Sequence, residues 1–154
     1  MNGEIIITVK ERIATYMSQC DSGYAYINNQ GYILEISDGS LQLVLIKGYE
    51  TEKIIPGERL IEKDLEKLDI VIEIIEAAKS NGIVEKIHAI DISDKDNFII
   101  EIPAENKDVE FGDKTNINIK VLWIVDLLER MNNISGTIVL NVPNIKKVYF
   151  RERV

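Results

Sequence analysis

The chain has 154 residues and a mass of 17.5 kDa, which is enough for one domain with a substantial apolar core and no disulfides. Apolar residues make up 45% of it and charged residues 29%, which excludes a disordered chain, and acidic residues interrupt the longest apolar runs, so no segment can span a membrane. With 18 Lys and Arg against 26 Asp and Glu, the net charge is -8, which makes nucleic acids and anionic lipids poor partners.

The first third of the chain is patterned for β-strands, with many β-branched residues between turn signals. Strands are predicted at residues 5–10, 12–19, 24–27, 32–36 and 41–46. The four residues 28–31, Asn-Asn-Gln-Gly, suit a tight reversal that needs positive φ. Residues 48–57 are expected to form an irregular loop packed on the domain surface.

Two windows have the 3.6-residue period of amphipathic helices, and they predict helices near residues 64–81 and 115–132. Asp64 is expected to cap the first helix and Gly82 to end it. Trp123 is placed beside the apolar stripe of the second. Four charged side chains of the first helix are expected near solvent: Glu66, Lys67, Glu73 and Lys79.

The remaining segments again alternate as strands and complete the predicted fold. They lie at residues 83–93, 98–102, 109–111, 136–142 and 146–151. The last two segments flank a turn at Pro143 and Asn144, and they predict a C-terminal hairpin. This order of elements indicates an α+β domain, with a largely antiparallel sheet, two packed helices and a C-terminal β-hairpin.

Cysteine and histidine each occur once, which limits the chemistry that the chain can carry. Cys20 alone excludes an internal disulfide and a thiolate zinc site. His88 lies in an alternating run, where a half-exposed strand histidine is expected rather than a ligand or a base. Glycines are scattered singly and no serine lies in a nucleophile elbow. We therefore predict no enzymatic activity, no catalytic residue and no cofactor.

Two groups of oxygen-bearing side chains are candidates for metal binding or acid–base chemistry. The first is Asp91, Asp94, Asp96 and Asn97. An EF-hand starting at Asp94 would need an oxygen ligand and a glycine where Phe98 and Ile99 stand, so a solvated hairpin turn without metal is predicted. The second is Glu50, Glu52, Glu58, Glu62, Asp64 and Glu66. On a loop that leads into an amphipathic helix, these acids are expected to be solvated rather than paired in a cleft.

Basic residues gather at the C-terminal end, against the acidic remainder. They are Lys146, Lys147, Arg151 and Arg153. Alternation places Val148 and Phe150 on one face of the last strand and Lys147, Tyr149 and Arg151 on the other. Such lysines can discourage unwanted pairing of an edge strand. Alternatively, the edge accepts an acidic partner strand by β-addition. The candidate partner-binding residues are Lys146, Lys147, Val148, Tyr149, Phe150 and Arg151.

The order of these signals resembles the extracytoplasmic β-domain of the bacterial cell-division family FtsQ/DivIB. The matching segments are residues 5–12, 26–27 with 31–35, 46–48 with 56–57, 111–112 with Lys120, Leu122 and 124–128, 136–138 and 148–151. The resemblance implies that residues 1–12 are the last strand of a POTRA-like domain, or a lead-in strand. Residues 13–154 then form the β-domain.

The resemblance also implies a function, which composition does not show. It implies a divisome scaffold without enzymatic activity, carried at the outer face of the plasma membrane at the septum by a single transmembrane helix in the full-length protein. The implied partners are DivIC/FtsB-like and FtsL-like division proteins, and the implied binding edge is the last strand, residues 146–151. One alternative is a small ligand-binding or enzymatic domain acting on a cationic molecule, given the acidic surface. Another is a cytoplasmic adaptor, which the free thiol of Cys20 allows.

Overall fold

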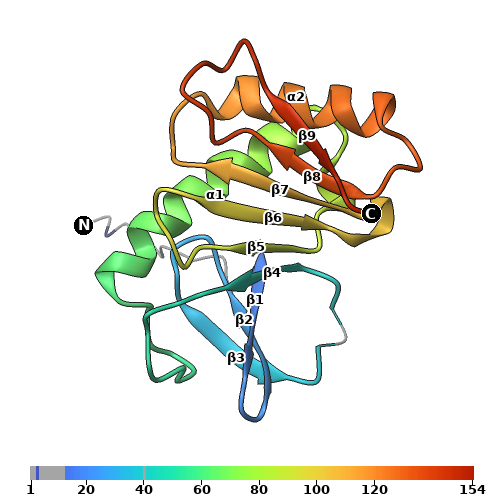
Figure 1. Cartoon of the computed structure of the whole chain (residues 1–154). Coiled ribbons are helices and arrows are strands. Elements are labelled where there is room, and N and C mark those ends of the chain that lie inside the picture. Colours follow the sequence, from blue (N-terminus) through green and yellow to red (C-terminus); the bar gives the residue numbers. More distant parts are fainter. Residues whose placement is uncertain (1–2, 4–12, 40) are drawn as a thin grey trace.

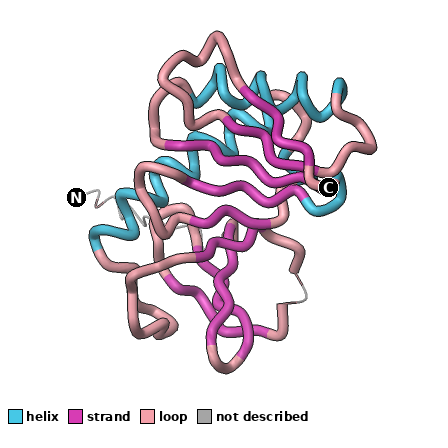
Figure 2. The backbone as a smooth tube through the Cα atoms, viewed as in Figure 1, coloured by secondary structure: helices cyan, strands magenta, loops and turns pink. Residues whose placement is uncertain are grey.

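The computed structural model describes residue 3 and residues 13–39 and 41–154. Within these residues the chain forms one nine-stranded sheet and two α-helices, which confirms the α+β prediction (Figure 1). The helices pack on one face of the sheet, and neither helix covers the other face, the uncovered face (Figures 1 and 2). The strand predicted at residues 5–10 and the unit predicted at residues 1–12 lie outside the described residues.

Neighbouring strands in the sheet follow the order β3-β2-β1-β4-β5-β6-β7-β8-β9. Their bounds are β1 Tyr16–Cys20, β2 Gly23–Ile27, β3 Ile33–Ser37, β4 Val44–Lys47, β5 Ala89–Asp91, β6 Phe98–Ile102, β7 Lys107–Gly112, β8 Gly136–Val139 and β9 Tyr149–Glu152. Three pairings are parallel, β1 with β4, β4 with β5 and β7 with β8, and the other five are antiparallel. The sheet is therefore largely antiparallel, as predicted.

Both helices connect parallel neighbours in the sheet. Helix α1, Glu62–Ser80, leads from β4 to β5, and α2, Ile117–Arg130, leads from β7 to β8. A parallel pair needs a crossover that passes over one face of the sheet, and right-handed crossovers in the same direction place both helices on the same face. Both helices are where the periodicity predicted them. The fold thus has two layers, the helices and the sheet.

The core lies between the sheet and the helices, and period-two alternation fills it. In β6, Phe98, Ile100 and Ile102 are fully buried, while Ile99 and Glu101 point to the uncovered face. Ile100 belongs to a row of aliphatic and aromatic residues that are paired across six neighbouring strands. The row consists of Phe150, Ile138, Val109, Ile100, Ile90 and Ile46. Full burial of a side chain of this size stabilises the fold by about 1.5–3 kcal/mol, and half-buried Phe150 contributes less.

The end of α1 is as predicted, but the strand expected after it is shorter. Gly82 adopts φ +72°, and the N–H groups of Gly82 and Ile83 donate to the carbonyls of Lys79 and Ala78, which closes the helix in a Schellman motif. Residues 83–87 are used in that closure and in a 3₁₀ turn, Val84–Lys86. The strand predicted at residues 83–93 is therefore reduced to β5.

The start of α1 differs from the prediction. The helix begins at Glu62, its N-cap is Ile61 with no capping side chain, and Asp64 lies fully buried inside the first turn. The carboxylate of Asp64 accepts hydrogen bonds from the backbone N–H of Glu50 at 3.0 Å and of Thr51 at 2.8 Å, and from the Thr51 hydroxyl. Asp64 is therefore neither a cap nor a solvated acid. It fastens the loop of residues 48–61 to α1.

Lys67 also departs from the expectation of a solvent-facing charge. It is 8% exposed, and its Nζ lies 3.7 Å from Glu50 on the same loop. The amphipathic pattern placed it on the outer side of the helix, but the loop of residues 48–61 covers that side. The apolar period of a helix does not predict that a loop remote in sequence covers its outer side.

The first turn of helix α2 contains a buried lysine. Lys120 is 4% exposed, its Nζ donates to the carbonyl of Asp113 at 3.1 Å, and it lies 4.9 Å from the centre of the Phe111 ring. Burial lowers the pKa of Lys120, against the attraction of Asp113. The hydrogen bond from the Thr115 hydroxyl lowers the pKa of Asp113. These contacts hold the turn between β7 and α2.

We expect Asp64→Asn to lower the free energy of unfolding by at least about 2 kcal/mol. An amide group loses the charge that strengthens three hydrogen bonds, and its NH₂ faces buried donors that need an acceptor. Urea unfolding measures the effect. Asp69→Asn, at an exposed position of the same helix, is the matched control, and a surface change of this kind falls within about 0.5 kcal/mol. Equal stability of the two variants would refute the role given to Asp64.

Candidate partner-binding edge

Strand β9 is one outer edge of the sheet, because among the described residues it pairs with β8 alone. It begins at Tyr149, later than the predicted residue 146. The N–H of Lys147 donates to the carbonyl of Asn144 at 3.0 Å, and the N–H of Lys146 donates to the side-chain oxygen of Asn144 at 3.1 Å. These bonds form a turn before the strand. Of the six candidate residues, Tyr149, Phe150 and Arg151 lie in β9, and Lys146, Lys147 and Val148 precede it.

The backbone groups on the outer side of β9 follow from its register. The N–H of Arg153 donates to the carbonyl of Ser135 at 2.8 Å, so residues 153, 151 and 149 point toward β8. In an antiparallel pair the direction alternates, and the N–H and C=O of Phe150 and Glu152 therefore point away from the sheet. β9 thus presents two donors and two acceptors along a free edge. Glu152 was not among the candidate residues, because its role depends on this register.

The side chains of β9 divide between the two faces as the alternation predicted. Val148 and Phe150 are half-buried against the core, whereas Tyr149 is 52% exposed on the uncovered face. The Phe150 ring lies 6.0 Å from Nζ of the buried Lys107. This face of the strand is held by apolar packing, and the other face is available to solvent.

Gly136 in β8 lets β9 approach closely, and it was not among the candidate residues. A Cβ at Gly136 would lie 2.4 Å from the carbonyl oxygen of Arg151 and 2.6 Å from Cζ of Phe150. Any larger residue would push β9 away from β8. A glycine inside a strand pattern is the signal that could have identified it.

The basic residues near β9 are not equivalent. Arg153 Nη2 lies 2.8 Å from Asp108 Oδ1, and Arg151 Nη1 lies 3.5 Å from Glu110 Oε1, so both arginines are attached to β7 across the open face. Lys146 and Lys147 are exposed and have no acidic side chain within 4.0 Å in the part of the chain that the structure describes. The lysines are therefore the cations that remain available to a partner.

The opposite edge of the sheet, β3, is partly covered. Ile33 donates its N–H to the carbonyl of Glu58 at 2.8 Å and accepts the N–H of Gly57 at 2.7 Å, and Tyr32 bridges to Arg59. The loop of residues 48–61 therefore takes the place of a neighbouring strand at the start of β3. The two edges of the sheet differ, and β9 is the more accessible one.

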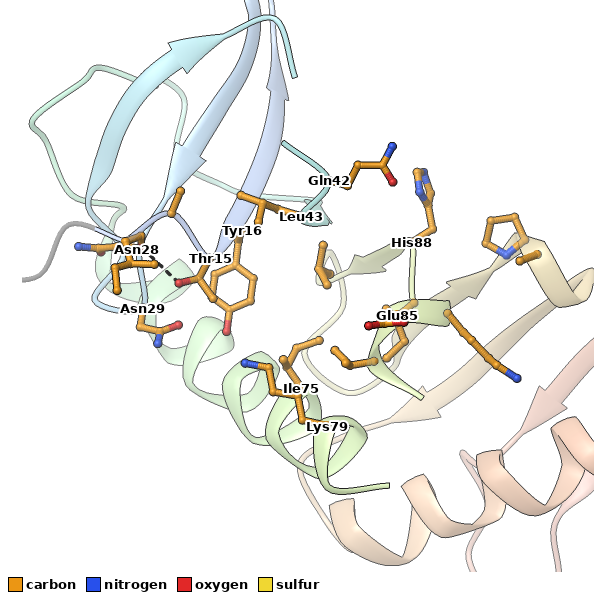
Figure 3. A pocket seen from close by; sticks show the side chains of 18 of the residues that line it. Thr15, Tyr16, Asn28, Asn29, Gln42, Leu43, Ile75, Lys79, Glu85 and His88 are labelled. Carbon is orange, nitrogen blue, oxygen red and sulfur yellow. Dashed lines mark hydrogen bonds between the residues drawn. The ribbon is translucent and has the colours of Figure 1, made fainter. Parts of the chain in front are cut away.

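An open cleft of about 960 Å³ lies where β1 and β4 begin, between the end of α1 and the 3₁₀ turn that follows it (Figure 3). Tyr16, Lys79 and His88 are among its lining residues, and burial raises the pKa of Tyr16 to about 12, with a further contribution from Glu76. His88 is exposed and lies directly before β5, so it is not the half-exposed strand histidine that was predicted. Among the described residues that line the cleft, the only carboxylate is Glu85. The cleft therefore lacks the converging acids that a cationic ligand requires.

In the acidic turn after β5, aspartate side chains accept hydrogen bonds from groups of the same turn. The side chain of Asp91 accepts the N–H and the hydroxyl of Ser93, and Asp94 accepts the N–H of Asp96 at 2.9 Å. Over the described ranges, no group of three or more His, Cys, Asp or Glu side chains could hold a metal ion. Over the same ranges, no helix is long and apolar enough to cross a membrane.

The fold and its free edge define the class of the molecule as an α+β domain with an open antiparallel edge strand. No protein-family model matches the chain. The chain is similar to the cell division protein DivIB of Clostridium tetani, with 24% identity over 135 residues. The match covers 86% of this chain and 50% of the DivIB sequence, so the chain spans about half the length of that relative. This similarity along most of the chain supports the resemblance to the FtsQ/DivIB family.

We expect Gly136→Ala to loosen β9 from β8, because the added methyl group collides with the backbone of Arg151 and the ring of Phe150. The free energy of unfolding should fall by about 1–3 kcal/mol. Amide hydrogen exchange should become faster at Tyr149 and Arg151, whose N–H groups point to β8. Ser135→Ala, one residue earlier, is the control and should leave both rates unchanged. Unaltered exchange in Gly136→Ala would contradict the close approach.

Proposed function

We propose that the chain is a cell-division domain of the FtsQ/DivIB type, which acts as a scaffold of the divisome and has no enzymatic activity. The similarity to DivIB supports a role in cell division. The observation that carries the proposal is the open edge of β9, with the backbone groups of Phe150 and Glu152 directed outward. In this proposal the edge binds DivIC/FtsB-like and FtsL-like division proteins outside the plasma membrane and so supports septum formation.

The binding mode that fits this edge is β-addition. A partner segment in extended conformation would satisfy the outward N–H and C=O groups of Phe150 and Glu152 and become a tenth strand. Backbone hydrogen bonds supply affinity in this mode, and flanking side chains supply selection. Tyr149, 52% exposed beside the edge, offers an aromatic anchor of the kind that often dominates binding energy.

The charges around the edge favour an acidic partner. The domain has a net charge of -8, yet Lys146 and Lys147 stand together in the turn before β9 without acidic neighbours among the described residues. Carboxylates on the partner would meet these lysines, speed association and exclude basic segments. Arg151 and Arg153 are held by Glu110 and Asp108 and contribute less selection.

We further propose that the whole protein is a single-pass membrane protein whose domain of residues 13–154 lies on the extracytoplasmic side at the division septum. The support is the similarity to DivIB. The matched region is only half of the DivIB sequence, so that relative contains further segments outside the match. A POTRA-like unit that includes residues 1–12 belongs to the same proposal.

Partner binding should protect a specific alternating set of backbone amides. In the free domain we expect slow hydrogen exchange at Tyr149 and Arg151 and fast exchange at Phe150 and Glu152. Addition of the extracytoplasmic part of the DivIC-like protein from the same organism should slow exchange at Phe150 and Glu152. NMR-detected exchange measures each amide separately. Protection at a different surface, with Phe150 and Glu152 unchanged, would locate the interface elsewhere.

Charge reversal in the turn tests the electrostatic part of the proposal. Lys146→Glu with Lys147→Glu should weaken binding of the same DivIC-like protein, and added salt should no longer lower the remaining affinity, because the charge pairs become repulsive and salt screens repulsion. Lys53→Glu with Lys95→Glu changes the net charge equally at exposed sites away from β9 and is the matched control. Calorimetric titration at two salt concentrations measures both pairs. Equal weakening by both pairs would mean that only the overall charge matters.

A further inference from the structure

Strand β3 is the outer strand at the end of the sheet opposite to β9 (Figure 1). Residues 32–37 read Tyr-Ile-Leu-Glu-Ile-Ser, with a single charged side chain among aromatic, β-branched and aliphatic ones. Ile36 in this segment is 36% exposed. A segment of this kind at an open sheet edge favours pairing with another chain. The region of β9 differs, because its four cations repel a second copy: Lys146, Lys147, Arg151 and Arg153.

The loop of residues 48–61 occupies the outward backbone groups at the start of β3. The N–H of Ile33 donates to the carbonyl of Glu58 at 2.8 Å, and the carbonyl of Ile33 accepts the N–H of Gly57 at 2.7 Å. The Arg59 guanidinium lies 5.4 Å from the centre of the Tyr32 ring, which adds a side-chain contact at the same place. A foreign strand therefore cannot bond Ile33 unless the loop moves away.

The pairing register identifies Ile36 as the second outward residue of β3. The carbonyl of Ile27 in β2 accepts the N–H of Thr15, on the side of β1. Backbone direction alternates along a strand, so Tyr26 directs its backbone groups to β3, where it pairs with Glu35. The backbone groups of Glu35 therefore point to β2, and the N–H and C=O of Ile36 point away from it. Outside the strands, no backbone group of the described residues bonds to Ile36.

We infer that the β3 edge is a self-association surface for a second copy of this chain, and that the loop of residues 48–61 blocks it. An antiparallel pair of β3 strands related by a two-fold axis places Ile33 of each copy opposite Ile36 of the other. This register satisfies the outward groups of both residues. It also sets Glu35 opposite Leu34, so that no like charges face each other. With the loop in place only Ile36 is left to pair, which is too little for a stable contact. The inference does not depend on what binds β9.

Two substitutions at Gly57 test whether the loop blocks the edge. Gly57 is exposed and has φ +89°. Gly57→Pro removes the N–H that binds Ile33 and cannot adopt positive φ, so the loop should leave the β3 edge. Gly57→Asn keeps the N–H and tolerates positive φ, and it is the matched control. Light scattering at physiological salt, which screens the net charge of -8, measures the mass of each variant. The mass of Gly57→Pro should double, whereas the parent and Gly57→Asn should be monomeric.

Hydrogen exchange identifies the surface that associates. In the parent, the amide of Ile33 should exchange slowly and that of Ile36 fast. In Gly57→Pro both should exchange fast in dilute solution and slowly once the dimer forms. Addition of Ile36→Lys to Gly57→Pro should restore the monomer, because the lysine would lie opposite Ile33 of the other copy. Gly136→Ala loosens β9 instead of β3, should remain monomeric, and controls for a general loss of stability.

A second variant, Thr51→Val with Arg59→Ala, loosens the loop at its contacts with Asp64 and Tyr32. A dimer of either variant that Ile36→Lys converts to a monomer supports the inference. Monomers of both variants overturn it when Ile33 exchanges fast, because the edge is then open and does not pair. They also overturn it when Ile33 exchanges slowly, because these contacts then do not hold the loop. A dimer that persists with Ile36→Lys, or a parent dimer with a protected Ile36, overturns it as well.

Discussion

The hydrogen bonds to the buried carboxylate of Asp64 govern how the two edges of the sheet come to differ. They hold Glu50 and Thr51, and through them the loop of residues 48–61, against α1. That loop then places Gly57 and Glu58 beside Ile33, where they occupy the start of the β3 edge. The loop thus covers the start of the β3 edge, whereas among the described residues no segment covers β9 in this way.

Strand β9 is held firmly by its neighbours, and its outward backbone groups remain accessible. Phe150 and Val148 pack on the helix side, Gly136 permits close pairing, and Arg153 reaches Asp108 on β7, so the strand is held from three directions. None of these contacts uses the outward backbone groups of Phe150 and Glu152. The edge is therefore ordered before a partner arrives, which lowers the entropy that binding must overcome.

Much of the fold could be predicted from the sequence, because its signals are local. The 3.6-residue period located both helices, alternation located β6 within its bounds, and Gly82 marked the end of α1. The predictions that were wrong concern residues whose contacts lie in segments remote in sequence. Aspartate is a common N-cap residue, but the hydrogen-bond partners of Asp64 lie 13 and 14 residues earlier in the chain. The same loop covers Lys67. The β9 edge was predicted as basic and alternating, whereas Glu152, Gly136 and the pairing of the arginines required the register of three strands.

The position of β9 at the end of the strand order also sets how the sheet comes apart. A strand with one neighbour opens at a lower free energy than the strands at the centre, so β9 frays more readily than β6 or β7. Each opening uncovers the inner edge of β8 and removes Phe150 from Gly136. A molecule that binds only closed β9 raises the free energy of this opening by RT ln(1 + [L]/Kd). The susceptibility of the C-terminal hairpin to proteases would therefore report how much of the protein is bound.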